Sequence, residues 1–157
     1  LNERKSLMST ALASKTHSVA ACDLRDWLGQ VEAMGQLASI SGAHWDVELG
    51  ALTEMILERM PTPPAVMFDS VPGYEPNRRV LANMLESLER TAVTLNLPIE
   101  LNAIPLIDAL RARLRALQPI KPNIVSTGAV MENVERGDQV DLFKFPVPRW
   151  HERVTLD

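Results

Sequence analysis

Proline sets the strongest limit on what this chain can fold into. Nine of its eleven prolines stand in four clusters, at residues 61–64, 72–76, 119–122 and 146–148. Proline fixes its own φ, donates no backbone hydrogen bond and disfavours helical geometry in the residue before it. No helix or central strand can therefore run through a cluster. The chain is divided into short elements joined by sharp turns.

Four segments between these clusters carry apolar residues at helical spacing. The first spans residues 23–35, with Asp23 as the N-cap and Gly35 as the left-handed stop. The others begin at Asp46, at Asn83 with a capping-box pattern to Glu86, and at Asn102. The four predicted core stripes are Leu24, Trp27, Leu28, Val31 and Met34; Leu49, Leu52, Met55, Ile56 and Met60; Leu85, Leu88, Ala92 and Leu95; and Leu106, Ile107, Leu110, Leu114 and Leu117. In particular, Trp27 is predicted to be a core anchor rather than a ligand-stacking residue.

Short apolar or alternating runs at residues 36–41, 65–68 and 79–82 predict strands. Residues 123–134 alternate loosely and predict one or two edge strands. Helices and strands alternate, so the predicted class is α/β or α+β, with a small mixed sheet covered by about four helices. The two prolines of residues 140–150 predict an extended segment, and its apolar side chains make residues 140–152 a predicted docking surface.

The expected organisation has three parts. Residues 1–22 are predicted to be a flexible leader, within which Met8 is a candidate start and residues 1–7 are a candidate vector-derived addition. Residues 23–118 are predicted to form the α/β domain. Residues 119–157 are predicted to be a linker followed by the extended, proline-rich segment.

Composition excludes several classes of function. The net charge is −4, so no domain-wide basic field exists to bind nucleic acid or an anionic membrane. No apolar run reaches the length of a membrane span. Cys22 is the single cysteine, which rules out an intrachain disulfide and a cysteine-based zinc site and fits a reducing, cytoplasmic setting.

The motifs that usually carry chemistry are absent. The chain has no G-x-G-x-x-G, no G-x-x-x-x-G-K and no G-x-S-x-G. Its histidines, His17, His44 and His151, are too far apart for a helical metal clamp. His17 lies in the leader, and His44 is interpreted as a turn residue beside Trp45. His151 and Glu152 leave two readings open, a cation site or a surface turn.

Two charged groups are interpreted as solvated helix faces. Glu48, Glu54 and Glu58 lie along the second helix, where an acid–base or metal pair is the alternative. Arg111, Arg113 and Arg115 are spaced by two, so they spread around the fourth helix instead of converging on a phosphate. No catalytic, cofactor-binding or metal-binding residue is therefore assigned.

Five segments, taken in order, resemble the N-terminal part of the UbiD-like decarboxylases, which use prenylated flavin. They are DLRDWLGQVEAMGQL, WDVELGAL, PAVMFDSVPGY, RRVLANML with Met84 in place of the family's Leu, and GAVMENVERGDQVDLFKFPVPRWHE. The resemblance covers roughly residues 23–152. It implies a carboxy-lyase in which the flavin forms an adduct with an aromatic or α,β-unsaturated acid and accepts the electrons freed as carbon dioxide leaves.

The same resemblance places the chemistry beyond residue 152. Family members continue with an Asp-Gly-Gly strand, a flavin-binding split barrel and a C-terminal domain, which hold the flavin, a divalent metal such as Mn and K. No ligand or catalytic residue transfers to this sequence. The expected function is the N-terminal domain or small subunit of a reversible decarboxylase that is homo-oligomeric when complete. The alternative is a non-catalytic interaction or ligand-binding module with the same fold.

Overall fold

The computed structural model describes Ala21 and residues 23–151. The rest of the predicted leader, with His17 and Cys22, and Glu152 at the other end lie outside the described residues. The four helices are α1 (Leu24–Ala33), α2 (Glu48–Arg59), α3 (Leu88–Thr94) and α4 (Ala103–Ala116). The strands are β1 (Leu37–Ser41), β2 (Ala65–Asp69) and β3 (Val80–Ala82). Three short 3-10 turns follow, at Ala129–Met131, Gly137–Gln139 and Leu142–Lys144.

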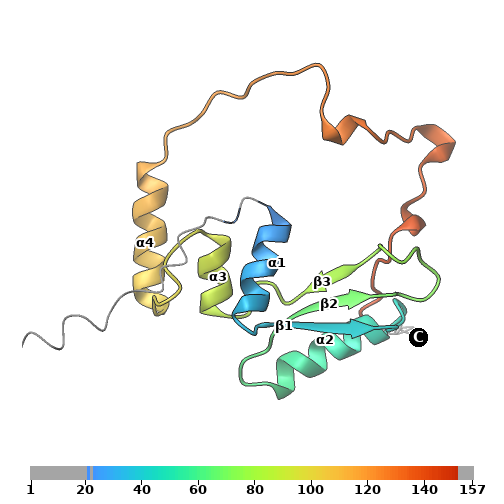
Figure 1. The fold of residues 1–157 in the computed structure, drawn as a ribbon, viewed down its shortest axis with the longest axis horizontal. Coiled ribbons are helices and arrows are strands. Elements are labelled where there is room, and N and C mark those ends of the chain that lie inside the picture. The colour runs from blue at the N-terminus through green and yellow to red at the C-terminus, as the bar shows by residue number, and fades with distance from the viewer. Residues whose placement is uncertain (1–20, 22, 152–157) are drawn as a thin grey trace, which may run out of the picture.

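The predicted mixed α/β class is confirmed. The sheet has the order β1-β2-β3, with β1 and β2 parallel and β2 and β3 antiparallel. Helix α2 makes the crossover between the parallel strands, and in Figure 1 it lies on one side of the sheet while α1 and α3 lie on the other. The domain is therefore a small sheet between two helical layers.

Alternate residues of β2 pack against the two helical layers, one on each face of the sheet. Ala65 packs in a cluster with Trp27, Val31 and Val93, whereas Val66 and Phe68 pack with Ala43 and Leu49. Such alternation follows from the pleat of a strand that is covered on both faces. Trp27 is 3% exposed, and its indole N–H donates to Thr94 Oγ1 at 2.9 Å. The structure thus bears out its prediction as a core anchor.

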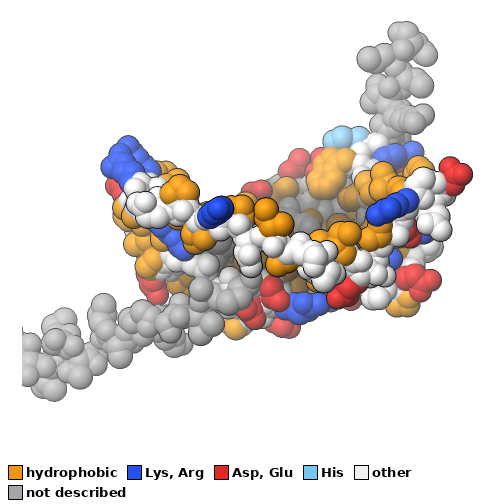
Figure 2. Space-filling model, turned by 90° about the horizontal axis from the view of Figure 1, so that it is seen from above, with side chains coloured by type: hydrophobic (Ala, Val, Ile, Leu, Met, Phe, Trp, Pro, Cys, Tyr) orange, Lys and Arg blue, Asp and Glu red, His pale blue; other side chains and the backbone are white. Residues whose placement is uncertain are grey.

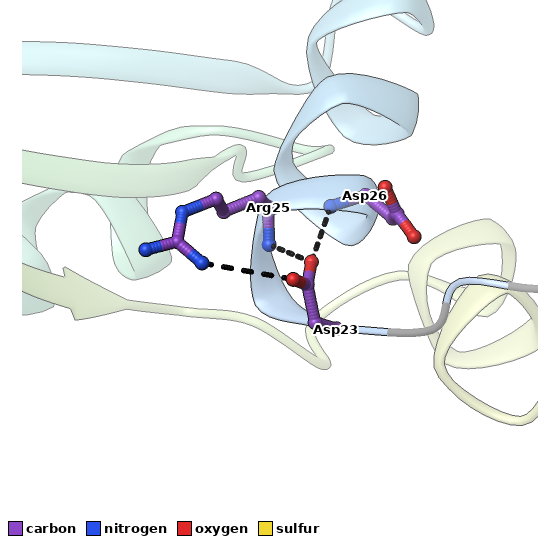
Figure 3. A network of polar contacts seen from close by, with 3 residues as sticks. All are labelled: Asp23, Arg25 and Asp26. Carbon is purple, nitrogen blue, oxygen red and sulfur yellow. Dashed lines mark hydrogen bonds and ion pairs between the residues drawn. The ribbon is translucent and has the colours of Figure 1, made fainter. Parts of the chain in front are cut away.

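The predicted start of α1 is also confirmed. Asp23 accepts hydrogen bonds from the backbone N–H groups of Arg25 and Asp26, at 2.8 and 3.0 Å, and Arg25 reaches its other oxygen (Figure 3). The bond from Asp26 is the main reason why the pKa of Asp23 lies below its ordinary value, since it favours the ionised carboxylate. Gly35, with φ of 69°, ends the helix in the left-handed conformation.

Two predicted helix starts are wrong. Asp46 is paired elsewhere and α2 is preceded by Val47, which has φ of 72° and makes no side-chain cap. Helix α3 begins after Ser87 instead of Asn83, because Ser87 Oγ accepts from the N–H of Arg90 while Asn83 adopts a left-handed turn conformation. At α2 the predicted cap, Asp46, pairs with the distant Arg149, and at α3 a second local cap, Ser87, takes the place of Asn83.

Some predicted core stripes face solvent. Met55 and Met60 of α2, and Leu85 and Leu88 near α3, are exposed, while the unpredicted Gly50, Thr53 and Arg90 are buried. On α4 only Leu106 is buried, and Ile107, Leu114 and Leu117 are exposed. Figure 1 shows α4 beside α3, away from the sheet, so no sheet face remains to cover its stripe.

The edge strands predicted within residues 123–134 do not form, and that region holds the 3-10 turn at Ala129–Met131. A strand needs a hydrogen-bonding neighbour, and this part of the chain runs clear of the sheet in Figure 1. The predicted extended segment at residues 140–150 is interrupted by the turn at Leu142–Lys144, so its side chains do not alternate between two faces.

Candidate functional site

His44 lies in the turn before α2. Its backbone N–H donates to Glu48 Oε2 at 2.7 Å, its Nδ1 accepts from the N–H of Asp46 at 3.1 Å, and its ring stacks on Trp45. These contacts hold the imidazole ring in the turn, in agreement with the interpretation of His44 as a turn residue. Glu48 is thereby engaged at the helix start rather than lying on a purely solvated face. The histidine is used to shape the connection from β1 to α2.

His151 lies against α2 through Glu54. Its Nε2 is 3.4 Å from Glu54 Oε1, and the same oxygen accepts a hydrogen bond from the indole N–H of Trp150 at 2.7 Å. Glu54, from the predicted solvated face, therefore holds the end of the described chain. Sequence reasoning missed this role because the partners are nearly a hundred residues apart. Glu58, one turn further, is exposed.

The described residues contain no group of three or more His, Cys, Asp or Glu side chains that could hold a metal ion. The arginines of α4 do not converge: Arg111 pairs with Asp108 on the surface, and Arg113 donates to the backbone carbonyls of Leu95 and Asn96. In Figure 2, Lys and Arg side chains gather over α4 at the left end of that face. Nothing in this arrangement forms a phosphate cradle.

An open depression of about 680 Å³ lies between the turn after β2 and the segment near Leu142–Lys144. Both signs of charge line it, from Glu75 and Asp141 and from Arg78 and Lys144. Arg78 also covers the ring of Phe145, and Lys144 pairs with Glu135. The contact of Arg78 with Phe145 thus links the two segments, whereas the pair of Lys144 with Glu135 lies within one of them. These contacts favour a structural joint over a catalytic pocket.

The strongest surface feature is a long stretch of exposed chain. Every residue from 111 to 145 is exposed, including large apolar ones such as Ile124 at 94% and Phe143 at 88%. Figure 1 shows this stretch, orange to red, arching away from the helices, and Figure 2 shows apolar side chains spread along the face seen from above. We call residues 117–145 the connecting segment. Exposed apolar surface of this extent is typical of interaction sites.

Arg90 is a feature that sequence reasoning did not find. It is 1% exposed, and its guanidinium donates to the carbonyls of Pro63, Asn83 and Met84 and to the side chain of Gln36. Burial lowers its pKa from the ordinary value. Its partners stand just before β1, just before β2 and just after β3, which all lie at one end of the sheet, so Arg90 is a structural centre rather than a ligand-binding group.

Among the residues that the structure describes, no helix has the length and apolar character needed to cross a membrane. Taken together, the side chains of Ala21 and residues 23–151 bring together no catalytic constellation, and their most extensive feature is exposed apolar surface. The candidate functional site is therefore an interaction surface, formed by the connecting segment and the part of α2 that contacts residues 149–151.

Comparison with known proteins identifies relatives of this chain. Residues 28–110 match the sequence model of the 3-octaprenyl-4-hydroxybenzoate carboxy-lyase N-terminal domain, UbiD_N. Pyrrole-2-carboxylic acid decarboxylase of Pseudomonas aeruginosa is 33% identical over 142 residues, which cover 85% of this chain and 28% of that protein. The chain thus spans less than a third of the length of this relative.

Solved structures give the same result. Vanillic acid decarboxylase of Sedimentibacter hydroxybenzoicus matches in its closed form with a TM-score of 0.72 at 26% identity, over 85% of this chain and 28% of that one. Its open form, with truncated ShVdcD, matches with a TM-score of 0.70 at 27% identity over the same shares. An evolved dimeric form of HmfF from Pelotomaculum thermopropionicum, in complex with prFMN, shares the fold with a TM-score of 0.64 at 24% identity, over 84% and 29%.

Proposed function

This chain belongs to the UbiD family, and we propose that it is the N-terminal domain, or a separately encoded small subunit, of a reversible decarboxylase. The substrate class would be an aromatic or α,β-unsaturated carboxylic acid. The match to the family's N-terminal domain over more than half of the chain carries this proposal. The decarboxylases of pyrrole-2-carboxylic and vanillic acid support the substrate class.

The exposed connecting segment supports the view that this chain works within a larger assembly. Isolated domains rarely expose apolar surface on this scale, because its burial is worth roughly 25 cal/mol per Å². The relative from Pseudomonas aeruginosa has more than two thirds of its length outside the matched region. We propose that the corresponding flavin-binding and C-terminal domains, or a second subunit, cover this segment, in a cytoplasmic homo-oligomer.

The cofactor of the proposed reaction is prenylated FMN, with Mn²⁺ and K⁺, and prFMN is bound by the structural relative HmfF. The described residues of this chain do not fit such a group. They bring together no metal-ligating cluster, and the depression beside Tyr74 is open and lined by charges of both signs, of which Arg78 covers the ring of Phe145 and Lys144 pairs with Glu135. We therefore propose that the flavin, the metal and the catalytic residues are held outside residues 21–151.

A non-catalytic interaction module with the same fold is the second candidate. The contact of Arg78 with Phe145 favours it, because this contact joins two segments of the chain and does not form a reaction centre. The two candidates differ in what the neighbouring coding sequence should contain. A reading frame or continuation with an Asp-Gly-Gly strand and a Glu-rich catalytic segment supports the enzyme, and its absence supports the module.

The direct experiment measures carbon dioxide release. The 157-residue chain alone, supplied with prenylated flavin, Mn²⁺ and a panel of aromatic and acrylic acids that includes pyrrole-2-carboxylate, should give no turnover. The chain joined to, or mixed with, the remaining domains should decarboxylate at least one acid. Turnover by the chain alone would refute the location proposed for the chemistry. Failure of the complete protein on every acid, with flavin bound, would refute the proposed reaction.

A further inference from the structure

We propose that α2 carries a clasp for residues 149–151 and that this clasp sets where the following part of the polypeptide lies against the N-terminal domain. The second half of this inference rests on the proposed function. The clasp comprises the turn at residues 45–47, Gly50 and Glu54, and it is where the chain returns to the domain after the exposed connecting segment.

Backbone pairing makes the first part of the clasp. The N–H of Arg149 donates to the carbonyl of Trp45 at 3.0 Å, and the carbonyl of Arg149 accepts from the N–H of Val47 at 3.1 Å. The Arg149 guanidinium also pairs with the carboxylate of Asp46. Val47 is a β-branched residue with φ of 72°, a conformation that persists only where its surroundings hold it. The bonds to Arg149 are part of that support.

Side chains on α2 make the second part. Glu54 Oε1 accepts the indole N–H of Trp150 at 2.7 Å and lies 3.4 Å from Nε2 of His151. One carboxylate therefore engages two consecutive residues of the segment. A hydrogen bond to an ionised acceptor is stronger than one between neutral groups, so Glu54 is well placed to fix the direction in which the chain continues.

Gly50 is the third and most specific part. It is buried in the first turn of α2, and a Cβ at this position would lie 2.7 Å from the carbonyl oxygen and 2.9 Å from the Cα of Trp150. Real Cβ atoms do not come so close to backbone, so only glycine lets residue 150 rest on the helix. Glycine inside a helix is unfavourable relative to alanine, and the close approach accounts for its presence.

Gly29 provides a matched control. It also lies within a helix, α1, but a Cβ there would meet nothing within 4 Å. Gly29→Ala should therefore raise the melting temperature of the 157-residue chain by a few degrees at most, through helix propensity alone. If Gly50 is only a helix residue, Gly50→Ala should do the same. If it belongs to a clasp, Gly50→Ala should lower the melting temperature and release residues 149–151.

Release can be followed by trypsin. Cleavage after Arg149 should become about tenfold faster in Gly50→Ala, as expected for loss of a charge-assisted contact, while cleavage after Arg136, in the connecting segment, serves as the internal reference. Equal cleavage ratios in Gly50→Ala and Gly29→Ala, with a raised melting temperature in both, would overturn the clasp.

A second variant keeps the inference testable if Gly50→Ala does not fold. In Glu54→Ala, the NMR signal of the Trp150 indole proton should move upfield, while that of Trp27, bonded to Thr94, should stay. Glu58→Ala, one turn further on α2, should change neither. An unmoved Trp150 signal in Glu54→Ala would refute the clasp.

Placement of the following domain is tested in the complete polypeptide by small-angle X-ray scattering. Gly50→Ala should enlarge the radius of gyration relative to Gly29→Ala, and equal radii would refute that half of the inference. None of these measurements depends on decarboxylation. If these measurements contradict the clasp but the complete protein releases carbon dioxide, the proposed function still holds. If they support the clasp but no carbon dioxide is released, the clasp still holds.

Discussion

Arg90 gives the most direct test of how this domain is held together. Its guanidinium is buried without a carboxylate contact and is held by four acceptors at 2.8 to 3.2 Å, which are three backbone carbonyls and the side chain of Gln36. Gln36 keeps a second bond, from Ser87, when the arginine is removed, whereas the carbonyls of Pro63, Asn83 and Met84 lose the donors that Arg90 provides. Removal of Arg90 therefore leaves those three carbonyls without the hydrogen bonds that it donates.

Arg90→Met keeps an unbranched chain of similar reach and removes every donor. Each buried carbonyl left without a partner costs about 1–3 kcal/mol. Recovery of the guanidinium's hydration in the unfolded state offsets part of that sum, because burial of the charge is itself unfavourable, as the lowered pKa of Arg90 indicates. A net loss of about 3–5 kcal/mol is expected, in the range found when one partner of a buried charged network is removed.

Urea unfolding followed by tryptophan fluorescence measures this loss. The midpoint should fall sharply in Arg90→Met with an unchanged slope, and Arg90→Lys should be intermediate, since one ammonium cannot span four acceptors in a planar fork. The control is Arg111→Met on α4, where the arginine is exposed and pairs with Asp108 at 3.8 Å. It should change stability by less than about 0.5 kcal/mol. A loss below about 1 kcal/mol in Arg90→Met would refute the role given to Arg90.

Two further predictions concern α1. Trp27→Ala should cost about 3–5 kcal/mol in the same urea experiment and Trp27→Phe clearly less, because most of the buried ring volume is kept; an unchanged melt for Trp27→Ala would remove Trp27 from the core. The pKa of Asp23 is lower in the folded state, so its cap contributes stability above the ordinary value of 3.8 and loses that contribution as pH falls through the lowered folded value. Asp23→Ala should therefore melt below the parent chain at pH 7 and approach it at strongly acid pH, and a constant gap across that range would contradict the assignment.

Several elements of this fold can be predicted from local sequence chemistry alone. The helix that starts at Asp23, the burial of Trp27 and the three strands followed from capping, helical spacing and short apolar runs between prolines. The family resemblance was visible in five ordered segments, and the comparisons confirm it. The helix start, the buried tryptophan and the strands depend on neighbours within a few residues. The family resemblance depends on the order of motifs along the chain.

Which helix faces find a partner depends on contacts between segments that are far apart in the chain. The carboxylate of Asp46 pairs with the distant Arg149, and Val47 stands before α2. Helix α3 begins after Ser87, whose hydroxyl also donates to Gln36, which is distant in sequence. The apolar stripe of α4 and the connecting segment remain exposed, since a sheet of three strands has no face left to cover them. An apolar pattern in the sequence predicts that a surface is buried. It does not predict which distant segment packs against that surface.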